Sequence, residues 1–359
     1  MRDFTYRRAD SIDEAIAGVA AGATPIAGGT ELLNWMRLGA DQSGAVIDIG
    51  DVDALRGISL RGGVVRIGSL ATLNEIEGDA TVREHAPVLA KACLESASAQ
   101  IRNSATLGGN LLQKTRCPYF RVEAGNETRL PWACNKRQVG SGCSAATGLN
   151  DHASIFGTTD ACRCNHPSDP AAALATIDAT VHVTGPDGER DIPASEFHLS
   201  QAEARDLLSS GQADGLKGAW AIGKAGAEAV LLNRMRGDEI ITGYSFSVDA
   251  ASANSVYLKV RERKSFEYAK VSAAVCLEAR DGRIQALRVA MGSIAQRPWR
   301  LRAAEAKLAG AVLTSDALTP VLDEEFASAR PASSQEYKVR LARNAARRAI
   351  LLAGGKSHA

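Results

Sequence analysis

The chain is organised around one stretch, residues 107–169, which contains LGGN (107–110), TRCPYF (115–120), PWACNKRQ (131–138), GSGCSAA (140–146) and DACRCNHPSD (160–169). Five of the seven cysteines lie in this stretch: Cys117, Cys134, Cys143, Cys162 and Cys164. The flanking sequence on both sides has the patterns of an ordinary protein of mixed helices and strands. We therefore interpret the stretch as a glycine turn that binds a cofactor, followed directly by an inserted cysteine loop.

The spacing of these cysteines, C-x16-C-x8-C-x18-C-x-C, does not identify the metal that they would bind. It lacks the paired C-x2–4-C knuckles of zinc ribbons and the C-x2-C-x2-C run of bacterial ferredoxins. Four thiolates on a long loop can still hold an iron–sulfur cluster, because folding brings them together. Structural zinc, with His152 or His166 as a further ligand, and unliganded thiols are the alternatives.

Length and composition place the chain among soluble, multidomain proteins. Its 359 residues exceed one compact core, and 45% apolar and 23% charged residues are ordinary values. A net charge of +1 gives no support to general nucleic-acid binding. We expect no membrane span, because no apolar run reaches roughly 18–20 residues. With no signal-peptide pattern at its start, the chain is expected in the cytoplasm by default, or in the periplasm if a signal-bearing partner exports it.

A first glycine turn precedes this stretch. TPI (24–26) predicts the end of a strand, AGGT (27–30) a turn, and ELLNWMR (31–37) a helix. Glycines there would let the backbone approach a diphosphate, and the N–H groups of the turn would face the anion. An ordinary turn is the alternative, since the pattern is not G-x-G-x-x-G.

The second turn, TLGGN (106–110), repeats the combination of a threonine with paired glycines. Thr30, Thr106 and Asn110 could supply hydroxyl and amide contacts to phosphate and ribityl groups. Two such turns in one chain favour a dinucleotide lying between two lobes.

The later part of the chain divides near residue 240. Residues 199–238 are rich in Ala, Gly and Asp and predict a helix and a connector. Residues 257–295 alternate apolar and polar positions around a turn at Asp281 and Gly282, which predicts a β-meander. The remaining sequence predicts two or more helices with basic faces.

Four segments together resemble the FAD-binding medium subunit of the molybdenum hydroxylases, the xanthine dehydrogenase and carbon monoxide dehydrogenase family: AGGTELLNWMR (27–37), TLGGNL (106–111), HPSDPAAALATIDATV (166–181) and YLKVRERKSFEYAKVSAA (257–274). With its cysteine insertion the chain is most similar to the FAD/4Fe–4S subunits of bacterial periplasmic-type aldehyde oxidoreductases. The 4-hydroxybenzoyl-CoA reductase β subunit is similar in having such an insertion.

The resemblance implies an α+β fold, with a two-lobed FAD-binding domain of the vanillyl-alcohol-oxidase/PCMH type and an α+β C-terminal domain of a β-meander plus helices. The implied divisions are residues 1–55 for the first lobe, 56–240 for the second lobe with an iron–sulfur loop at 113–166, and 241–359 for the C-terminal domain.

The resemblance also implies the residues of the site. The positions that match FAD-binding residues are Ala27, Gly28, Gly29, Thr30, Leu32, Thr106, Gly109, Asn110, Asp169 and Lys259. Asp169 would approach the flavin and Lys259 would lie near its ring; a helix N-cap and a strand-face lysine are the alternative interpretations. The cysteines matching the 4Fe–4S ligands are Cys117, Cys134, Cys143 and Cys162, with Cys164 as the alternative to Cys162.

The implied function is electron transfer within a heterotrimer. A large subunit with a molybdenum cofactor would oxidise an aldehyde, and a small subunit with two 2Fe–2S clusters would deliver electrons to FAD here, from where they leave to an external acceptor. A 4-hydroxybenzoyl-CoA reductase-type enzyme, with inward electron flow, and a non-redox binding module with structural zinc are the alternatives. The chain alone is not expected to turn over substrate.

Overall fold

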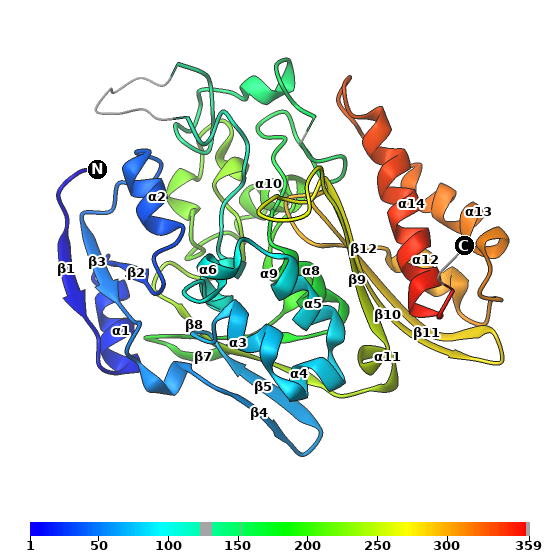
Figure 1. Ribbon diagram of the computed structural model, residues 1–359. Helices are drawn as coiled ribbons and strands as arrows, with labels where there is room; N and C mark the ends of the chain where they lie inside the picture. Colours follow the sequence, from blue (N-terminus) through cyan, green and yellow to red (C-terminus); the bar gives the residue numbers. More distant parts are fainter. Residues whose placement is uncertain (123–130, 152, 357–359) are drawn as a thin grey trace.

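The computed structural model describes residues 1–122, 131–151 and 153–356, and arranges them around three sheets (Figure 1). The first sheet is parallel in the order β1-β3-β2 and carries two helices. Its elements are β1 (Thr5–Arg8), α1 (Ile12–Ala20), β2 (Thr24–Ile26), α2 (Leu32–Arg37) and β3 (Ala45–Asp48).

The sequence SIDEAIAGVAAG (11–22) predicts a helix with Ser11 as N-cap, Glu14 in a capping box and Gly22 as its stop, and α1 begins and ends there. The hydroxyl of Ser11 accepts a hydrogen bond from the backbone N–H of Glu14, and Gly22 adopts a φ of +92° just after the helix. The expected capping box is incomplete, because the Glu14 carboxylate accepts from the N–H of Asp10 and not of Ser11.

The second sheet is antiparallel, in the order β4-β5-β8-β6-β7. Its strands are β4 (Ile58–Arg61), β5 (Val64–Gly68), β6 (Thr180–Gly185), β7 (Gly188–Pro193) and β8 (Ile240–Ser247). Helices pack on it around a large apolar core; they are α3 (Leu73–Gly78), α4 (Ala80–His85), α5 (Pro87–Glu95), α6 (Ala99–Arg102), α7 (Leu107–Leu111), α8 (Asp169–Thr176) and α9 (Ala194–Phe197). The division expected near residue 240 falls at the first residue of β8, and this strand lies between β5 and β6. The domain limits therefore stay a prediction.

The third sheet is the expected antiparallel meander, in the order β12-β11-β10-β9. Its strands are β9 (Ser255–Val260), β10 (Val271–Arg280), β11 (Arg283–Gly292) and β12 (Trp299–Arg300), preceded by α11 (Ala250–Ala253). Three helices cover it around a second core (Figure 1): α12 (Arg302–Leu308), α13 (Ser315–Phe326) and α14 (Glu336–Ala353).

Two segments with little regular structure lie above the second sheet in Figure 1. The described part of the cysteine stretch contains a short 3-10 helix, Ser144–Ala146. The segment 199–238 contains α10 (Gln201–Ser209), as expected, and two 3-10 turns, Ala219–Ala221 and Ala227–Ala229. Within the described ranges, no helix combines the length and apolar character that a membrane crossing requires.

Candidate functional site

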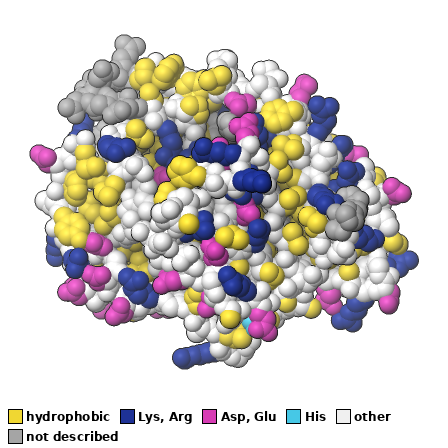
Figure 2. All heavy atoms as spheres, viewed as in Figure 1, with side chains coloured by type: hydrophobic (Ala, Val, Ile, Leu, Met, Phe, Trp, Pro, Cys, Tyr) yellow, Lys and Arg dark blue, Asp and Glu magenta, His cyan; other side chains and the backbone are white. Residues whose placement is uncertain are grey.

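A cavity of about 800 Å³ lies between the N-terminal lobe, the helices that pack on the second sheet, strand β9 and the cysteine segment. Its lining includes all ten residues predicted to bind FAD: Ala27, Gly28, Gly29, Thr30, Leu32, Thr106, Gly109, Asn110, Asp169 and Lys259. Lys and Arg side chains gather near the middle of the face in Figure 2, between the N-terminal lobe and the C-terminal helices. The volume lies within the usual range for small-molecule and cofactor sites.

The first glycine turn is held against the chain that leads into the second. A side chain on Gly28 would overlap the carbonyl oxygen of Ser104, so the two backbones touch at this point. Gly29 adopts a φ of +67°, which a glycine reaches without strain. Within the described residues, no acceptor pairs with the backbone N–H groups of Gly28, Gly29 or Thr30. These free donors line the cavity and suit an anionic ligand.

The second glycine turn presents side chains instead of free main-chain donors. Thr106 is the N-cap of α7, and its hydroxyl accepts a hydrogen bond from the N–H of Gly109 (3.2 Å). Asn110 accepts a hydrogen bond from Ser168 through Oδ1 (2.6 Å). The second turn is thereby tied to the start of α8.

Asp169 and Lys259 form one buried ion pair at the cavity wall. Lys259 Nζ lies 2.7 Å from Asp169 Oδ2 and also donates to the carbonyl of Glu95 (2.9 Å). The hydroxyl of Tyr257 donates to the other oxygen of Asp169. Burial first, and then the negative charge of Asp169, raises the pKa of Tyr257 well above its ordinary value. The N-cap of α8 is Ser168, so the N-cap interpretation of Asp169 is wrong.

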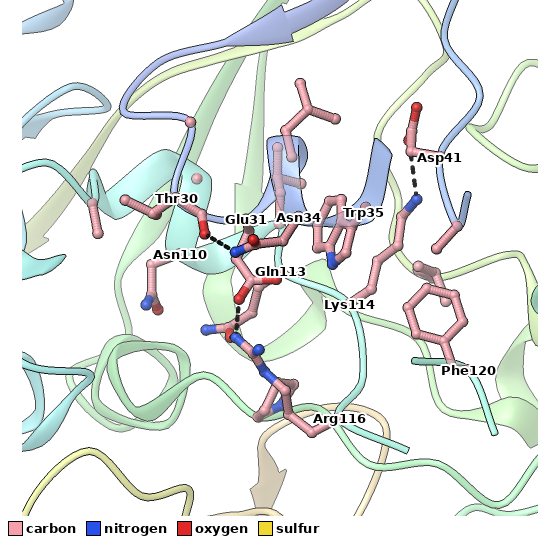
Figure 3. Close-up of a pocket in the computed structure, with 18 of the residues that line it drawn as sticks. Thr30, Glu31, Asn34, Trp35, Asp41, Asn110, Gln113, Lys114, Arg116 and Phe120 are labelled. Atoms are coloured by element: carbon pink, nitrogen blue, oxygen red, sulfur yellow. Dashed lines mark hydrogen bonds and ion pairs between the residues drawn. The ribbon is translucent and has the colours of Figure 1, made fainter. Parts of the chain in front are cut away.

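Glu31 links three parts of the molecule, although no specific contact was expected of it. Its carboxylate forms ion pairs with Arg116 and with Arg121, the latter at 2.7 Å. The Arg116 guanidinium stacks 4.1 Å from the ring centre of Tyr268. Figure 3 shows Arg116 reaching up from the cysteine segment toward Glu31 and Gln113. No local pattern marks this network, because 85 residues separate Glu31 from Arg116.

Lysines from two further segments also line the cavity, and no sequence pattern predicted them. Lys114 lies 3.4 Å from Asp41 and 4.7 Å from the ring centre of Trp35 (Figure 3). Lys217, from the segment 199–238, lines the same wall. Burial is the main cause that lowers the pKa of each lysine, and Asp41 partly offsets it for both.

The cysteines predicted as ligands come together beside this cavity. Cys134 and Cys143 face each other in an antiparallel bridge, and Cys162 lies close enough to Cys143 to raise the pKa of its thiol. Cys117 lies close enough to Cys162 and Cys134 to affect its titration. Asn135 holds the intervening loop, because its Oδ1 accepts hydrogen bonds from the N–H groups of Gly140 and Gly142.

The environment of the thiols suits a bound cationic centre. Burial raises the pKa of Cys117 to about 12, while backbone N–H groups from residues 119 and 120 oppose this rise. The thiol of Cys162 and burial raise the pKa of Cys143. A metal centre would favour the thiolates by neutralising their mutual repulsion. Lys136 lies beside Cys164, Cys162 and Cys134.

The geometry of the cysteines does not by itself define a metal centre. Among the described residues, no three His, Cys, Asp or Glu side chains are arranged to hold a metal ion. Cys164, the alternative ligand, is buried and donates a hydrogen bond to Gln296 (3.2 Å). His166 packs against His198 with tilted rings whose centres lie 4.0 Å apart, and His152 lies outside the described residues.

Residues 2–210 match the family described as the FAD binding domain in molybdopterin dehydrogenase, and residues 256–353 match the CO dehydrogenase flavoprotein C-terminal domain. The chain belongs to this family. It is 34% identical, over 96% of both chains, to the aldehyde oxidoreductase FAD-binding subunit PaoB of Escherichia coli. It is 24% identical to the carbon monoxide dehydrogenase medium chain of Hydrogenophaga pseudoflava, over 97% of this chain and 96% of the relative.

Solved structures confirm the fold of this FAD-binding family member. A carbon monoxide dehydrogenase structure from Hydrogenophaga pseudoflava superposes with a TM-score of 0.70 at 22% identity, over 99% of this chain and 98% of the other. The expected resemblance, the α+β fold of a FAD-binding domain with a C-terminal domain, and the assignment as an oxidoreductase FAD subunit are confirmed. The matches support FAD and do not extend to a 4Fe–4S cluster. Residues 211–255 lie outside both family matches.

Proposed function

We propose that this chain is the FAD- and 4Fe–4S-containing electron-transfer subunit of a heterotrimeric molybdenum hydroxylase that oxidises aldehydes. Its partners would be a large subunit with the molybdenum cofactor and a small subunit with 2Fe–2S clusters, from which electrons leave through this chain to an external acceptor. The aldehyde assignment follows the similarity to PaoB. We place the complex in the cytoplasm, or in the periplasm if a partner carries an export signal.

One observation carries the proposal: the ten predicted FAD residues line one cavity, and the predicted cluster ligands converge beside it. Lys136 connects the two regions, since its side chain lines the cavity and also lies beside three of the cysteines. A flavin in the cavity and a cluster on the cysteines would therefore be neighbours.

The residues of this chain have distinct tasks in such a site. The free N–H groups of Gly28, Gly29 and Thr30 would bind the diphosphate, and the amide of Asn110 would orient the adjoining chain of the cofactor. The Asp169–Lys259 pair would form a polar, buried wall near the ring. FAD supplies the ability to take up electrons singly and to release them in pairs.

The cysteines fit a 4Fe–4S cluster held by Cys117, Cys134, Cys143 and Cys162. Four thiolates form the usual ligand set of such a cluster, and the nearby ammonium group of Lys136 would offset its negative charge. Such a cluster would supply one-electron transfer. The backbone N–H groups directed at Cys117, Cys134 and Cys143 are of the kind that stabilises coordinated sulfur.

Reduction of the purified complex by an aldehyde tests the function. The full chain is co-expressed with its two partners, and flavin absorbance is followed after an aldehyde is added without oxygen. We expect the flavin band to bleach in the complex and to stay unchanged in the isolated chain. A complex that turns over aldehyde with a dye acceptor while its flavin stays oxidised would refute the proposed electron path.

A further inference from the structure

The cavity wall formed by Lys114, Lys136, Arg137, Lys217 and Asp41 carries more positive than negative charge. Lys114 and Lys217 share one carboxylate, Asp41, as their electrostatic partner. Lys136 and Arg137, which also line the cavity, repel the charge of Lys114. The side chain of Lys136 lies beside the cysteines, and Arg137 donates to three main-chain carbonyls.

Lys217 is held rigidly at this wall by its main chain. Its N–H donates to the carbonyl of Met235 (2.8 Å). Gly218, which follows it, has a φ of +110° and packs so closely that a side chain there would lie 2.8 Å from the carbonyl oxygen of Val230. The Lys217 side chain lines the cavity, and its ammonium group has no ion-pair partner within 4.0 Å among the described residues.

The surroundings of both lysines disfavour their charge when the cavity holds no anion. The Lys217 side chain is accessible to solvent, yet the cavity walls remove part of its hydration, and Lys114 repels it. Lys114 loses hydration in the same way and lies 3.4 Å from Asp41, a long ion pair. An anion between the two lysines would relieve both effects.

We propose that Lys114 and Lys217 form a phosphate-binding wall of the cavity. The inference rests on the FAD site proposed above. Lys217 lies in residues 211–255, outside both family matches, whereas Lys114 lies inside the first of them. The phosphate belongs either to the FAD diphosphate or to a second, phosphorylated ligand.

Binding measurements on Lys217→Gln separate these sources. The affinity of the apo full chain for FAD is measured by quenching of flavin fluorescence, and pyrophosphate binding to the FAD-loaded chain is measured by calorimetry. Loss of one charge-assisted hydrogen bond lowers affinity by about tenfold or more. Lys217→Arg keeps the charge, and Lys224→Gln changes an exposed lysine of the same segment that stacks on Trp220. Both are expected to bind like the wild type.

Each result of these binding measurements either supports the proposal or overturns it. A drop in FAD affinity of about tenfold assigns the wall to the FAD diphosphate. Unchanged FAD affinity with lost pyrophosphate binding assigns it to a second ligand. Unchanged binding of both overturns the inference. If the wild type binds no FAD, the proposed function fails, and pyrophosphate binding by the apo chain, wild type against Lys217→Gln, still tests the wall. Melting temperatures of all variants confirm that they fold.

Discussion

Lys259 Nζ lies 2.7 Å from Asp169 Oδ2, and only 1% of the lysine side chain and 5% of the aspartate side chain are exposed. The family resemblance predicted two separate contacts to a flavin for these residues. The structure joins them, so each side chain supports the charge of the other. The wall of the cavity at this point is a neutral pair and not a lone cation.

Lys259→Met is therefore expected to destabilise the protein strongly. Removing one partner leaves Asp169 buried without its cation, which costs roughly 3–5 kcal/mol. The free energy of unfolding is measured by urea denaturation. The matched control is Lys91→Met, because Lys91 forms a half-exposed pair with Glu95 at 2.8 Å and should cost less than about 1 kcal/mol. Equal losses in the two variants would contradict the assignment of a buried pair.

Gly28→Ala is expected to open the contact between the first glycine turn and the chain that leads into the second. The added methyl group would overlap the carbonyl oxygen of Ser104, and such overpacking costs roughly 1–3 kcal/mol or more. FAD binding should weaken together with stability, because the first turn moves away from the second. Gly78→Ala serves as the control, since a side chain there meets no atom within 4 Å. An alanine variant at position 28 with the stability and FAD affinity of the wild type would show that the backbones do not touch.

Serine substitutions test the cysteine ligands one at a time. Cys117→Ser, Cys134→Ser, Cys143→Ser and Cys162→Ser should each lose iron and acid-labile sulfide, measured on protein purified without oxygen. Cys276→Ser replaces a fully buried cysteine of β10 outside the segment and should keep both. Cys164→Ser should also keep the cluster. If Cys164→Ser loses iron while Cys162→Ser keeps it, the fourth ligand has been assigned to the wrong cysteine.

The buried Lys338 predicts a pH dependence of stability. Burial lowers its pKa from the ordinary 10.5 to about 7, and its ammonium donates to the carbonyl of Ala153 (2.7 Å). Between these values the unfolded chain binds more protons than the folded one, so the free energy of unfolding rises with pH, by up to about 1.4 kcal/mol per pH unit. Below the folded pKa this contribution is constant.

Urea denaturation of Lys338→Met at several values of pH between 7 and 10 measures this contribution as a difference from the wild type. The Lys338→Met variant should lose this increase of the free energy of unfolding with pH. The carbonyl of Ala153 keeps its hydrogen bond from Gln335 (2.6 Å). Lys307→Met, at a half-exposed position, should leave the slope unchanged. Identical slopes for Lys338→Met and the wild type would contradict the lowered pKa.

Local patterns predicted much of the fold. The two glycine turns, the meander and the helix after Ser11 each follow from a few neighbouring residues, and the structure contains all of them. The apolar stripe of VREHAPVLAKACLESAS (82–98) predicts one helix, but the structure has two, α4 and α5, because Pro87 cannot donate the hydrogen bond that would continue the first. The position of Pro87 in the sequence is enough to predict this break.

The contacts that tie the site together were not predictable in this way. Glu31 meets Arg116, and Asp169 meets Lys259, across 85 and 90 residues, and neither pair has a local signal. Lys217 lies in a segment without a clear apolar period, so only the folded chain reveals that it lines the cavity. Charge pairing over such separations depends on the packing of whole lobes.

The cofactor content of the full chain, purified without oxygen, tests the central claim most directly. FAD, iron, acid-labile sulfide and zinc are measured per mole of protein. We predict one FAD and one 4Fe–4S cluster in each chain, with no zinc. A colourless protein that contains zinc and no flavin would contradict it.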